Sequence, residues 1–313
     1  MLLFVAPPYR RAPAGLLAAA DVSVGRFGRQ RFANGELHVT IEEEVRDQAC
    51  VVLGSIAPPD EQMLSMLLLC HTLKKEGARE VVALLPYLAY SRQDKACARE
   101  SLAAAWTGAL LRGSQVDRVV TFDVHSPRAA RQSGIPVVSL SPAAAFAKQL
   151  GLLGPGGAIS LVAPDDGAIA RCKAVSEAAQ KTQPIVCFHK QRTGKTVRHE
   201  HFEGVLAGRA VVVDDILDTG ATLVSCCREL TRAGVTEIVV MITHGLFTGE
   251  AWKELWAAGV RQIYTTDTVP LPPQVRSSRI HVLPIVADAA PALRAAAAAE
   301  PVIFWQESEQ VAQ

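Results

Sequence analysis

Short apolar runs alternate with longer amphipathic stretches along the whole chain, and this alternation restricts the fold more than any other feature of the sequence. Each run is rich in valine and isoleucine and is apolar at nearly every residue. Such runs are typical of strands that are covered on both faces, as in parallel sheets joined by crossover helices. The alternation therefore predicts an α/β fold. The predicted strands are Ala49–Leu53, Glu80–Leu85, Arg118–Phe122, Ile159–Val162, Pro184–Phe188, Arg209–Val213, Glu237–Ile242 and Gln262–Thr265.

The stretches between these strands have the periodicity of helices. The chain starts with the apolar run MLLFV, and arginines follow it, which is the reverse of the order in a secretory signal. We therefore expect a buried first strand there. The predicted helices are Asp60–Lys75, Ser101–Arg112, Gly167–Ala179, Ala221–Ala233, Glu250–Ala258 and an alanine-rich helix at about Ala292–Glu300.

A weak internal repeat indicates that one α/β design is used twice. The segment KKEGAREVVALL around Gly77 resembles TRAGVTEIVVMI around Gly234, and both read as a helix that ends at glycine before a strand. VDRVVTFD, ending at Asp123, likewise resembles VRQIYTTD, ending at Asp267. The length of 313 residues suits two domains, and the glycine-rich segment Gly151–Ala158 is the best candidate for a linker.

Composition excludes several classes of protein. Lys and Arg number 32 against 31 Asp and Glu, so the formal charge is +1, which argues against a general nucleic-acid binder. No apolar run reaches the roughly 18 residues of a membrane span. The seven cysteines include no CxxC pair and lie mostly among aliphatic residues. We expect reduced thiols in a cytoplasmic protein that has neither a disulfide framework nor a zinc site.

The most informative motif is VVVDDILDTGATL, at Val211–Leu223. It reads as a buried strand, a loop of small residues and a helix start, where free backbone N–H groups favour an anion such as phosphate. Asp214 and Asp215 would repel phosphate, so they suit two sugar hydroxyls or Mg²⁺ instead. A capped strand–helix turn without a ligand is the structural alternative, because Asp and Thr are good N-caps.

Further motifs give this loop its context. The loop resembles the phosphoribosyl-binding signature of type I phosphoribosyltransferases and of ribose-phosphate pyrophosphokinases, also called PRPP synthetases. The order of the other motifs is similar to that of the PRPP synthetase family. This resemblance implies two duplicated type I phosphoribosyltransferase-like domains, each with a largely parallel central sheet flanked by helices. The motifs are FANGE at Phe32–Glu36, SRQDK at Ser91–Lys95, ARE at Ala98–Glu100, TFDVHS at Thr121–Ser126, APDDG at Ala163–Gly167 and HKQR at His189–Arg192.

The resemblance also assigns ranges. Residues 1–148 would form the N-terminal domain with the ATP-binding motifs, and 149–288 the C-terminal domain with the ribose 5-phosphate loop. Residues 289–313 would form a helix and tail that pack back on the N-terminal domain. The implied reaction converts ATP and ribose 5-phosphate into PRPP and AMP with Mg²⁺ as cofactor.

The implied ATP site combines an adenine loop with charged turns. Taken alone, these turns could equally be solvated surface. Asn34 replaces the acid that is usual in the middle of the adenine loop, and a neutral amide can still bond to a base edge. The residues that the resemblance places at ATP are Phe32, Asn34, Glu36, Arg92, Gln93, Asp94, Arg99 and His125.

The remaining implied residues act on metal, sugar phosphate and transition state. Lys190 and Arg192 would be catalytic, on an exposed basic loop that closes over the reacting phosphates. The implied metal ligands are Asp123, His125 and Asp165. The implied ribose 5-phosphate residues are Asp214, Asp215, Asp218, Thr219, Gly220, Ala221 and Thr222, in a DTGAT sequence where many members of the family have DTAGT.

Two other functions stay open. A type I phosphoribosyltransferase would use the same loop without ATP motifs, and a catalytically inactive PRPP synthetase-like subunit would regulate an active enzyme. The resemblance further implies a homo-oligomer that is at least a dimer, with a dimer-based hexamer as a second alternative, in which the Phe32–Glu36 loop completes a neighbour's ATP site. We expect neither nucleic acid nor membrane as a partner.

Overall fold

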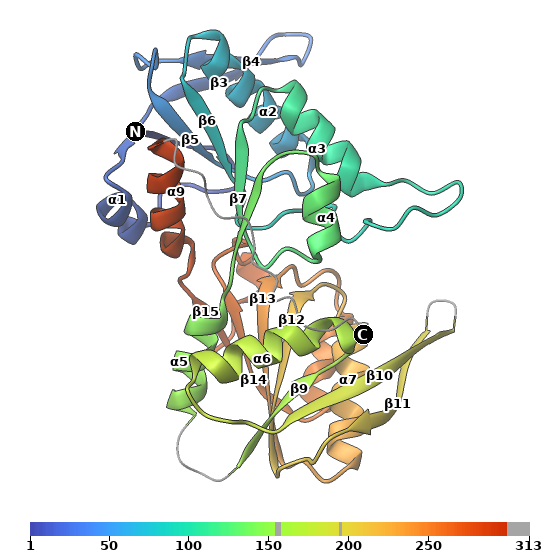
Figure 1. The fold of residues 1–313 in the computed structure, drawn as a ribbon. Helices are drawn as coiled ribbons and strands as arrows, with labels where there is room; N and C mark the ends of the chain where they lie inside the picture. Colours follow the sequence, from blue (N-terminus) through green and yellow to red (C-terminus); the bar gives the residue numbers. More distant parts are fainter. Residues whose placement is uncertain (154–157, 194–195, 299–313) are drawn as a thin grey trace, which may run out of the picture. The chain divides into compact units, whose positions relative to one another are not determined.

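The computed structural model describes residues 1–153, 158–193 and 196–298. It divides into two compact units (Figure 1). Unit 1 holds Met1–Leu140 and the segment that begins at Val286, and unit 2 holds Ser141–Ile285. The predicted domain ranges 1–148, 149–288 and 289–313 remain predictions.

Unit 1 is built on a six-stranded sheet with the order β2-β1-β5-β6-β7-β8, in which every neighbouring pair is parallel. All residues of the central strands β5 and β6 are buried, which explains their uninterrupted apolar sequences. The strands are β1 (Leu2–Val5), β2 (Ser23–Val24), β5 (Ala49–Leu53), β6 (Glu80–Leu84), β7 (Arg118–Phe122) and β8 (Val137–Leu140).

Helices cover this sheet. Leu69 and Leu73 of α2 pack with Leu111 of α3 in the same buried cluster as the sheet residues Val52 and Val119. Helix α9 contacts α1 and β6 (Figure 1). An antiparallel pair, β3 with β4, lies against α2. These elements are α1 (Ala14–Ala20), α2 (Asp60–Lys75), α3 (Ala103–Gly113), α4 (Pro127–Gln132), α9 (Ala290–Ala297), β3 (Phe27–Arg31) and β4 (Leu37–Ile41), with the 3₁₀ turn η4 (Val286–Ala289) before α9.

Unit 2 has a seven-stranded sheet with the order β11-β10-β9-β12-β13-β14-β15, in which β10 and β11 are antiparallel and every other pair is parallel. The strands are β9 (Ile159–Ala163), β10 (Ile185–Thr193), β11 (Thr196–Glu203), β12 (Arg209–Leu217), β13 (Glu237–Gly245), β14 (Val260–Thr266) and β15 (Ile280–Leu283). The helices are α5 (Ala143–Leu152), α6 (Ile169–Ala178), α7 (Ala221–Arg232) and α8 (Glu254–Ala257), with 3₁₀ turns η1 (Asp166–Ala168), η2 (Ala251–Lys253) and η3 (Pro273–Val275).

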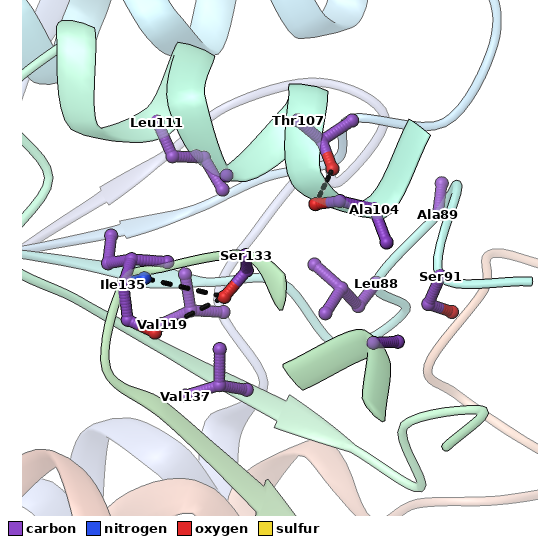
Figure 2. Close-up of a pocket in the computed structure, with 12 residues that line it drawn as sticks. Leu88, Ala89, Ser91, Ala104, Thr107, Leu111, Val119, Ser133, Ile135 and Val137 are labelled. Carbon is purple, nitrogen blue, oxygen red and sulfur yellow. Dashed lines mark hydrogen bonds between the residues drawn. The ribbon is translucent and has the colours of Figure 1, made fainter. Parts of the chain in front are cut away.

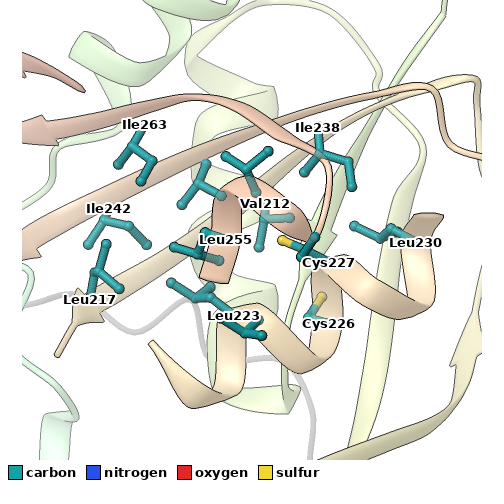
Figure 3. Packing of buried hydrophobic residues seen from close by; sticks show 14 of the residues in the cluster. Val212, Leu217, Leu223, Cys226, Cys227, Leu230, Ile238, Ile242, Leu255 and Ile263 are labelled. Carbon is teal, nitrogen blue, oxygen red and sulfur yellow. The ribbon is translucent and has the colours of Figure 1, made fainter. Parts of the chain in front are cut away.

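Alternate residues of β12 pack into two different hydrophobic clusters, one on each face of the sheet. Val212 packs in the cluster that includes Leu223 and Leu230 of α7, whereas Val211 and Val213 pack with residues of α5 and α6. Figure 3 shows the α7 side of the sheet, where the apolar face of α7 points at β12, β13 and β14. Both faces of this strand are therefore buried, as the VVV sequence predicts.

The duplication predicted from the repeat extends to individual hydrogen bonds. Gly77 and Gly234 both have positive φ, +95° and +89°, at the ends of α2 and α7. The N–H that follows each glycine donates to a helix carbonyl at 3.0 Å, from Ala78 to Leu73 and from Val235 to Leu230. Such bonds terminate a helix in the left-handed conformation. The second repeat also matches, because the N–H groups of Asp123 and Asp267 donate to the last residues of β8 and β15, at 2.9 and 3.0 Å.

The predicted α/β class with two related parallel-sheet domains is confirmed. One local prediction is wrong: the basic stretch from His189 is not an open loop, because β10 continues to Thr193 and pairs with β11. The β-branched residues Thr193, Thr196 and Val197 favour this hairpin. The predicted helix Glu250–Ala258 is a 3₁₀ turn and a short helix. Strands β2, β3, β8, β11 and β15 were not expected.

Candidate functional site

The strand order of unit 2 reverses between β9 and β12, since β10 lies on one side of β9 and β13 lies beyond β12. Ligands of open α/β sheets bind at the carboxyl ends of the strands at such a reversal. Asp165 follows β9, and Asp214 and Asp215 lie near the end of β12. The fold therefore brings three acids that are far apart in sequence to the edge where a ligand is expected.

The acids on β12 are buried. Asp214 is 9% exposed and Asp215 is 6% exposed, and the Asp214 Oδ1 atom accepts a hydrogen bond from the Asp215 N–H at 3.0 Å. Burial raises the pKa of Asp214 well above its usual value of 3.8, and the charge of Asp215 raises it further. Asp165 adds to this rise, which indicates that its carboxylate lies close by. Carboxylates of this kind are suited to a ligand that donates hydrogen bonds or carries positive charge.

Arg171 is the cation of this site, and the sequence motifs did not reveal it. From α6, its Nη2 atom lies 3.4 Å from Asp215 Oδ2, and its Nη1 donates to the Gly167 carbonyl at 3.0 Å. Its positive charge lowers the pKa of Asp214, in opposition to the burial and the other acids. The only signal in the sequence is an arginine two residues into the helix after the APDDG motif.

The loop after β12 has the geometry of an anion site. Gly220 directly precedes α7 with φ of +87°, and as the N-cap residue it has no side chain that could cap the helix. A Cβ atom at Gly220 would lie 2.8 Å from the Trp252 Cα atom, so glycine is required at this position. A backbone hydrogen bond stabilises the loop, since the Thr248 N–H donates to the Asp218 carbonyl at 3.1 Å. Thr219, Ala221 and Thr222 complete it.

The two predicted catalytic residues lie on strand β10. Lys190 pairs with His199 and Arg192 with Val197 in the register of the β10–β11 hairpin, and the side chains of both lie outside the part of the chain that the structure describes. His189 holds the base of the hairpin, because its Nδ1 lies 3.5 Å from Asp166 Oδ1 and its Nε2 lies 3.2 Å from Glu203 Oε1. The hairpin is thus tied to the turn that follows Asp165.

In unit 1 the predicted phosphate and metal segments adjoin each other. Arg92, Gln93 and Arg99 are exposed in the long connection after β6, but Asp94 is buried and accepts a hydrogen bond from Ser126. Ser126 follows the predicted Asp123 and His125, at the end of β7. Asp123 has φ of +39°, which is uncommon for a residue with a side chain, and His125 is exposed.

The FANGE segment is the turn of the β3–β4 hairpin. The Phe32 N–H donates to the Glu36 carbonyl at 2.9 Å, and Asn34 Oδ1 accepts from the Glu36 N–H at 3.1 Å. Asn34 thereby stabilises the turn itself, a role that an aspartate could also fill. The Phe32 ring is 55% exposed, with its centroid 5.1 Å from that of His38, so it presents a free aromatic surface.

The predicted metal ligands come from both units, Asp123 and His125 from unit 1 and Asp165 from unit 2. Within the described residues, no group of three or more His, Cys, Asp or Glu side chains is arranged to hold a metal ion alone. Mg²⁺ usually takes only one or two carboxylates from a protein and fills its shell with water and substrate phosphates. Asp165, beside Asp214, fits that limited donor set.

The reversal point of unit 1 is chemically different from that of unit 2. There the strands β1 and β5 are followed by Ala6 and Gly54, and neither residue carries a carboxylate. The small pocket in Figure 2 lies elsewhere in unit 1, beside α3, and is lined mainly by apolar side chains such as Leu88, Leu111 and Val119. Its Ser133 hydroxyl is bonded to Ile135 and Ala130. This pocket is a packing gap, and of the two described reversal points only that of unit 2 has the acids and the anion loop.

No helix within the described ranges is long and apolar enough to cross a membrane.

A parallel α/β sheet with acids and a glycine-led helix start at its reversal point is typical of enzymes that bind phosphorylated ligands. Comparison with known proteins identifies the family within this class of enzymes. The family model for the N-terminal domain of ribose phosphate pyrophosphokinase matches residues 12–114, and the model for the phosphoribosyl synthetase-associated domain matches residues 169–304.

Relatives match over most of the chain. A ribose-phosphate pyrophosphokinase from Caldanaerobacter subterraneus is 32% identical over 270 residues, which are 85% of this chain and 83% of the relative. One from Pasteurella multocida is 28% identical over 287 residues, 89% of this chain and 88% of the relative. The crystal structure of phosphoribosylpyrophosphate synthetase from Mycobacterium smegmatis has a TM-score of 0.82 at 27% identity and covers 94% of this chain and 98% of that one. The chain belongs to the ribose-phosphate pyrophosphokinase family, as its motifs predicted.

Proposed function

We propose that this protein transfers the diphosphoryl group of ATP to the anomeric hydroxyl of ribose 5-phosphate, giving PRPP and AMP. The observation that carries the proposal is the pair of buried acids and the glycine-led loop at the reversal point of unit 2. Membership of the ribose-phosphate pyrophosphokinase family supports it.

Ribose 5-phosphate is the ligand proposed for unit 2. The loop Asp218–Thr222 binds the 5-phosphate through backbone N–H groups at the start of α7, because the first turn of a helix presents such groups to an anion. Asp214 and Asp215 accept hydrogen bonds from the ribose hydroxyls. Arg171 keeps the two acids oriented and offsets their mutual repulsion.

ATP is the ligand proposed for unit 1. Arg92, Gln93 and Arg99 are exposed and suit its phosphates, which a guanidinium can bind with two hydrogen bonds. The Phe32 ring suits the face of the adenine base, with Asn34 and Glu36 at its edge.

Mg²⁺ is the proposed cofactor, with Asp123, His125 and Asp165 as its candidate ligands. When bound, it would neutralise phosphate charge. In the transfer, a bond forms between the anomeric oxygen and the β-phosphorus while the bond from that phosphorus to the AMP oxygen breaks, and the hydroxyl proton is released. Lys190 and Arg192, on the β10–β11 hairpin, supply positive charge to the phosphates in the transition state.

The proposal extends to the assembly and the compartment. We propose a homo-oligomer built on dimers, in which the Phe32–Glu36 turn contributes to the ATP site of a neighbouring subunit. A cytoplasmic location is consistent with seven cysteines that are all free thiols.

One assay tests the function. Purified protein with ATP, Mg²⁺ and ribose 5-phosphate should form AMP and PRPP in equal amounts. A phosphoribosyltransferase would instead form pyrophosphate from PRPP and a base, and an inactive regulatory subunit would form no AMP, so either result would overturn the proposal.

The roles of the hairpin residues have a separate test. Lys190→Ala and Arg192→Ala should each lower kcat by about 10³-fold, because cationic groups at a transferring phosphoryl group have effects of that size. Arg228→Ala is the matched control, since Arg228 pairs with Glu254 on the surface of the same unit. A kcat within tenfold of wild type in both variants would exclude the assigned roles.

A further inference from the structure

Asp94 differs from its neighbours in the connection between β6 and α3. Arg92, Gln93, Lys95 and Arg99 are exposed, but the Asp94 side chain is only 6% exposed. A buried carboxylate costs free energy unless it is hydrogen-bonded. Its burial therefore requires a hydrogen-bond partner within the fold.

The partner of Asp94 is Ser126, whose Oγ–H donates to Asp94 Oδ2. The same Ser126 oxygen accepts a hydrogen bond from the Ala129 N–H at 3.0 Å, as the N-cap of α4. Since the hydroxyl uses both its proton and a lone pair, its orientation is determined from both sides. The bond joins residues 32 positions apart in the chain.

Each end of this bond adjoins a segment of the proposed ATP site. Asp94 directly follows Arg92 and Gln93, and Ser126 directly follows His125. The first segment is held a second time at the start of α3, where Ser101 Oγ donates to Gln93 Oε1 at 2.6 Å and the Ala104 N–H donates to the Gln93 carbonyl at 3.2 Å. The Gln93 N–H also donates to the Tyr90 carbonyl at 3.1 Å, but of these bonds only the one between Asp94 and Ser126 reaches the segment after β7.

We propose that Asp94 is a positioning residue that acts through Ser126, and that neither side chain contacts ATP. The bond sets the spacing between the arginine segment that binds the phosphates and the Asp123–His125 segment that binds the metal. This inference rests on the proposed function for the identity of the ligand. It replaces the direct contact between Asp94 and ATP that the family resemblance implies, and it agrees with charge, because a carboxylate would repel the phosphates.

A double-mutant cycle tests the coupling. Asp94→Ala and Ser126→Ala should each lower kcat/KM for ATP at least tenfold, and the double variant should be no worse than the worse single variant. KM for ribose 5-phosphate should stay within threefold of wild type. If Asp94 contacted ATP directly, the two losses would multiply in the double variant, and that result would overturn the proposal.

Conservative variants separate positioning from charge. Asp94→Asn keeps an oxygen that can accept from Ser126, and Ser126→Thr keeps the hydroxyl, so each should recover most of the loss seen in the alanine variant. If Asp94→Asn is as impaired as Asp94→Ala, the charge itself is required and the proposal is wrong. Ser141→Ala is the matched control, because Ser141 Oγ accepts from the Ala143 N–H at 3.2 Å in unit 2, away from Asp94 in sequence and unit.

A measurement without turnover keeps this test independent of the function. Limited trypsin digestion, followed by mass spectrometry, should cut after Lys95 and Arg99 at least fivefold faster in Asp94→Ala and Ser126→Ala than in wild type, Asp94→Asn or Ser141→Ala. Equal cutting rates would overturn the anchoring role. A wild-type protein that makes no AMP would instead overturn the proposed function and leave the digestion result to decide the anchor.

Discussion

At the scale of single residues, Gly220 offers the sharpest prediction. Gly220→Ala should lower the free energy of unfolding by about 1–3 kcal/mol and raise KM for ribose 5-phosphate at least tenfold. The reason is twofold: φ is +87°, and the new Cβ atom would lie 2.8 Å from the Trp252 Cα atom. Urea unfolding and steady-state kinetics measure both effects.

Gly234→Ala is the matched control for that substitution. Gly234 has φ of +89°, but a Cβ atom there would meet no atom within 4 Å. It should therefore suffer only the backbone strain, about 1 kcal/mol, with KM unchanged. If both variants lose the same stability and keep the same KM, close packing against Trp252 is not what requires Gly220.

Asp214 links the pH dependence of stability to function. Burial and Asp215 raise its pKa, so the folded state holds a proton at pH values where the unfolded state has released it. The wild-type free energy of unfolding therefore falls as pH rises from about 4 through the raised pKa, by about 1.4 kcal/mol for each pH unit that separates the folded from the unfolded pKa. Asp214→Asn removes this fall, so it should be more stable than wild type at pH 8 and bind ribose 5-phosphate at least tenfold more weakly.

Urea unfolding of both proteins at pH 5 and pH 8, with metal removed, measures the effect. The Asn side chain keeps an oxygen for the Asp215 N–H, so the turn is preserved. An Asp214→Asn variant that is less stable than wild type at pH 8 would contradict the prediction.

At the scale of elements, helix α3 contains two glycines in opposite situations. A Cβ atom at Gly108 would lie 1.9 Å from the Ser133 carbonyl oxygen, whereas one at Gly113 would meet nothing within 4 Å. Gly108→Ala should therefore force α3 away from the end of α4 and cost about 1–3 kcal/mol. Gly113→Ala should stabilise the helix by up to about 1 kcal/mol. Equal changes in thermal unfolding would show that α3 and α4 do not pack as described.

The elements also show how far local pattern predicts structure. Helix α2 was predicted at the bounds it has, Asp60–Lys75, and strand β5 at Ala49–Leu53, because each is long or apolar enough to be defined by its own residues. Strand β11 was missed, because its polar sequence is ordered by pairing with β10 and not by a core. Strands β8 and β15 lie at sheet edges, where residues are only partly buried and the apolar signal is weak.

At the scale of the whole molecule, the reactivity of the cysteines shows whether the core of each unit is closed. Six of the seven are buried, and only Cys97 is exposed. Burial raises the pKa of Cys70, Cys172 and Cys227 to about 12, which suppresses their reactive thiolate forms. A thiol reagent at pH 8 should therefore label one cysteine rapidly in the native protein and all seven in denaturant.

Cys97→Ser should abolish the rapid labelling of the native protein. In denaturant, this variant should have six reactive thiols in place of seven. Two or more thiols that react at the rate of Cys97 would mean that a core is open. Because the buried cysteines occur in both units, the labelled positions would identify which unit opens.

The sequence by itself determined the α/β class, the positions of most strands along the chain and the loop around Gly220, since each depends on residues that are adjacent or periodic in the chain. It also indicated the family, because six short motifs occur in the order that the family has. The roles assigned to the individual site residues stay predictions.

Only the tertiary structure determined which side chains contact each other. Arg171 meets Asp215 across 44 residues of sequence, as 215 − 171 gives, and Asp94 meets Ser126 across 32. Neither pair has a periodicity that a sequence could reveal, because each contact joins chain segments that the fold brings together beside neighbouring strands, β9 and β12 for Arg171 and Asp215, and β6 and β7 for Asp94 and Ser126. The fold also buries Asp94, a residue that the family resemblance places at ATP, between exposed neighbours. The burial of a side chain depends on which residues the fold packs against it, and those residues are distant in the sequence.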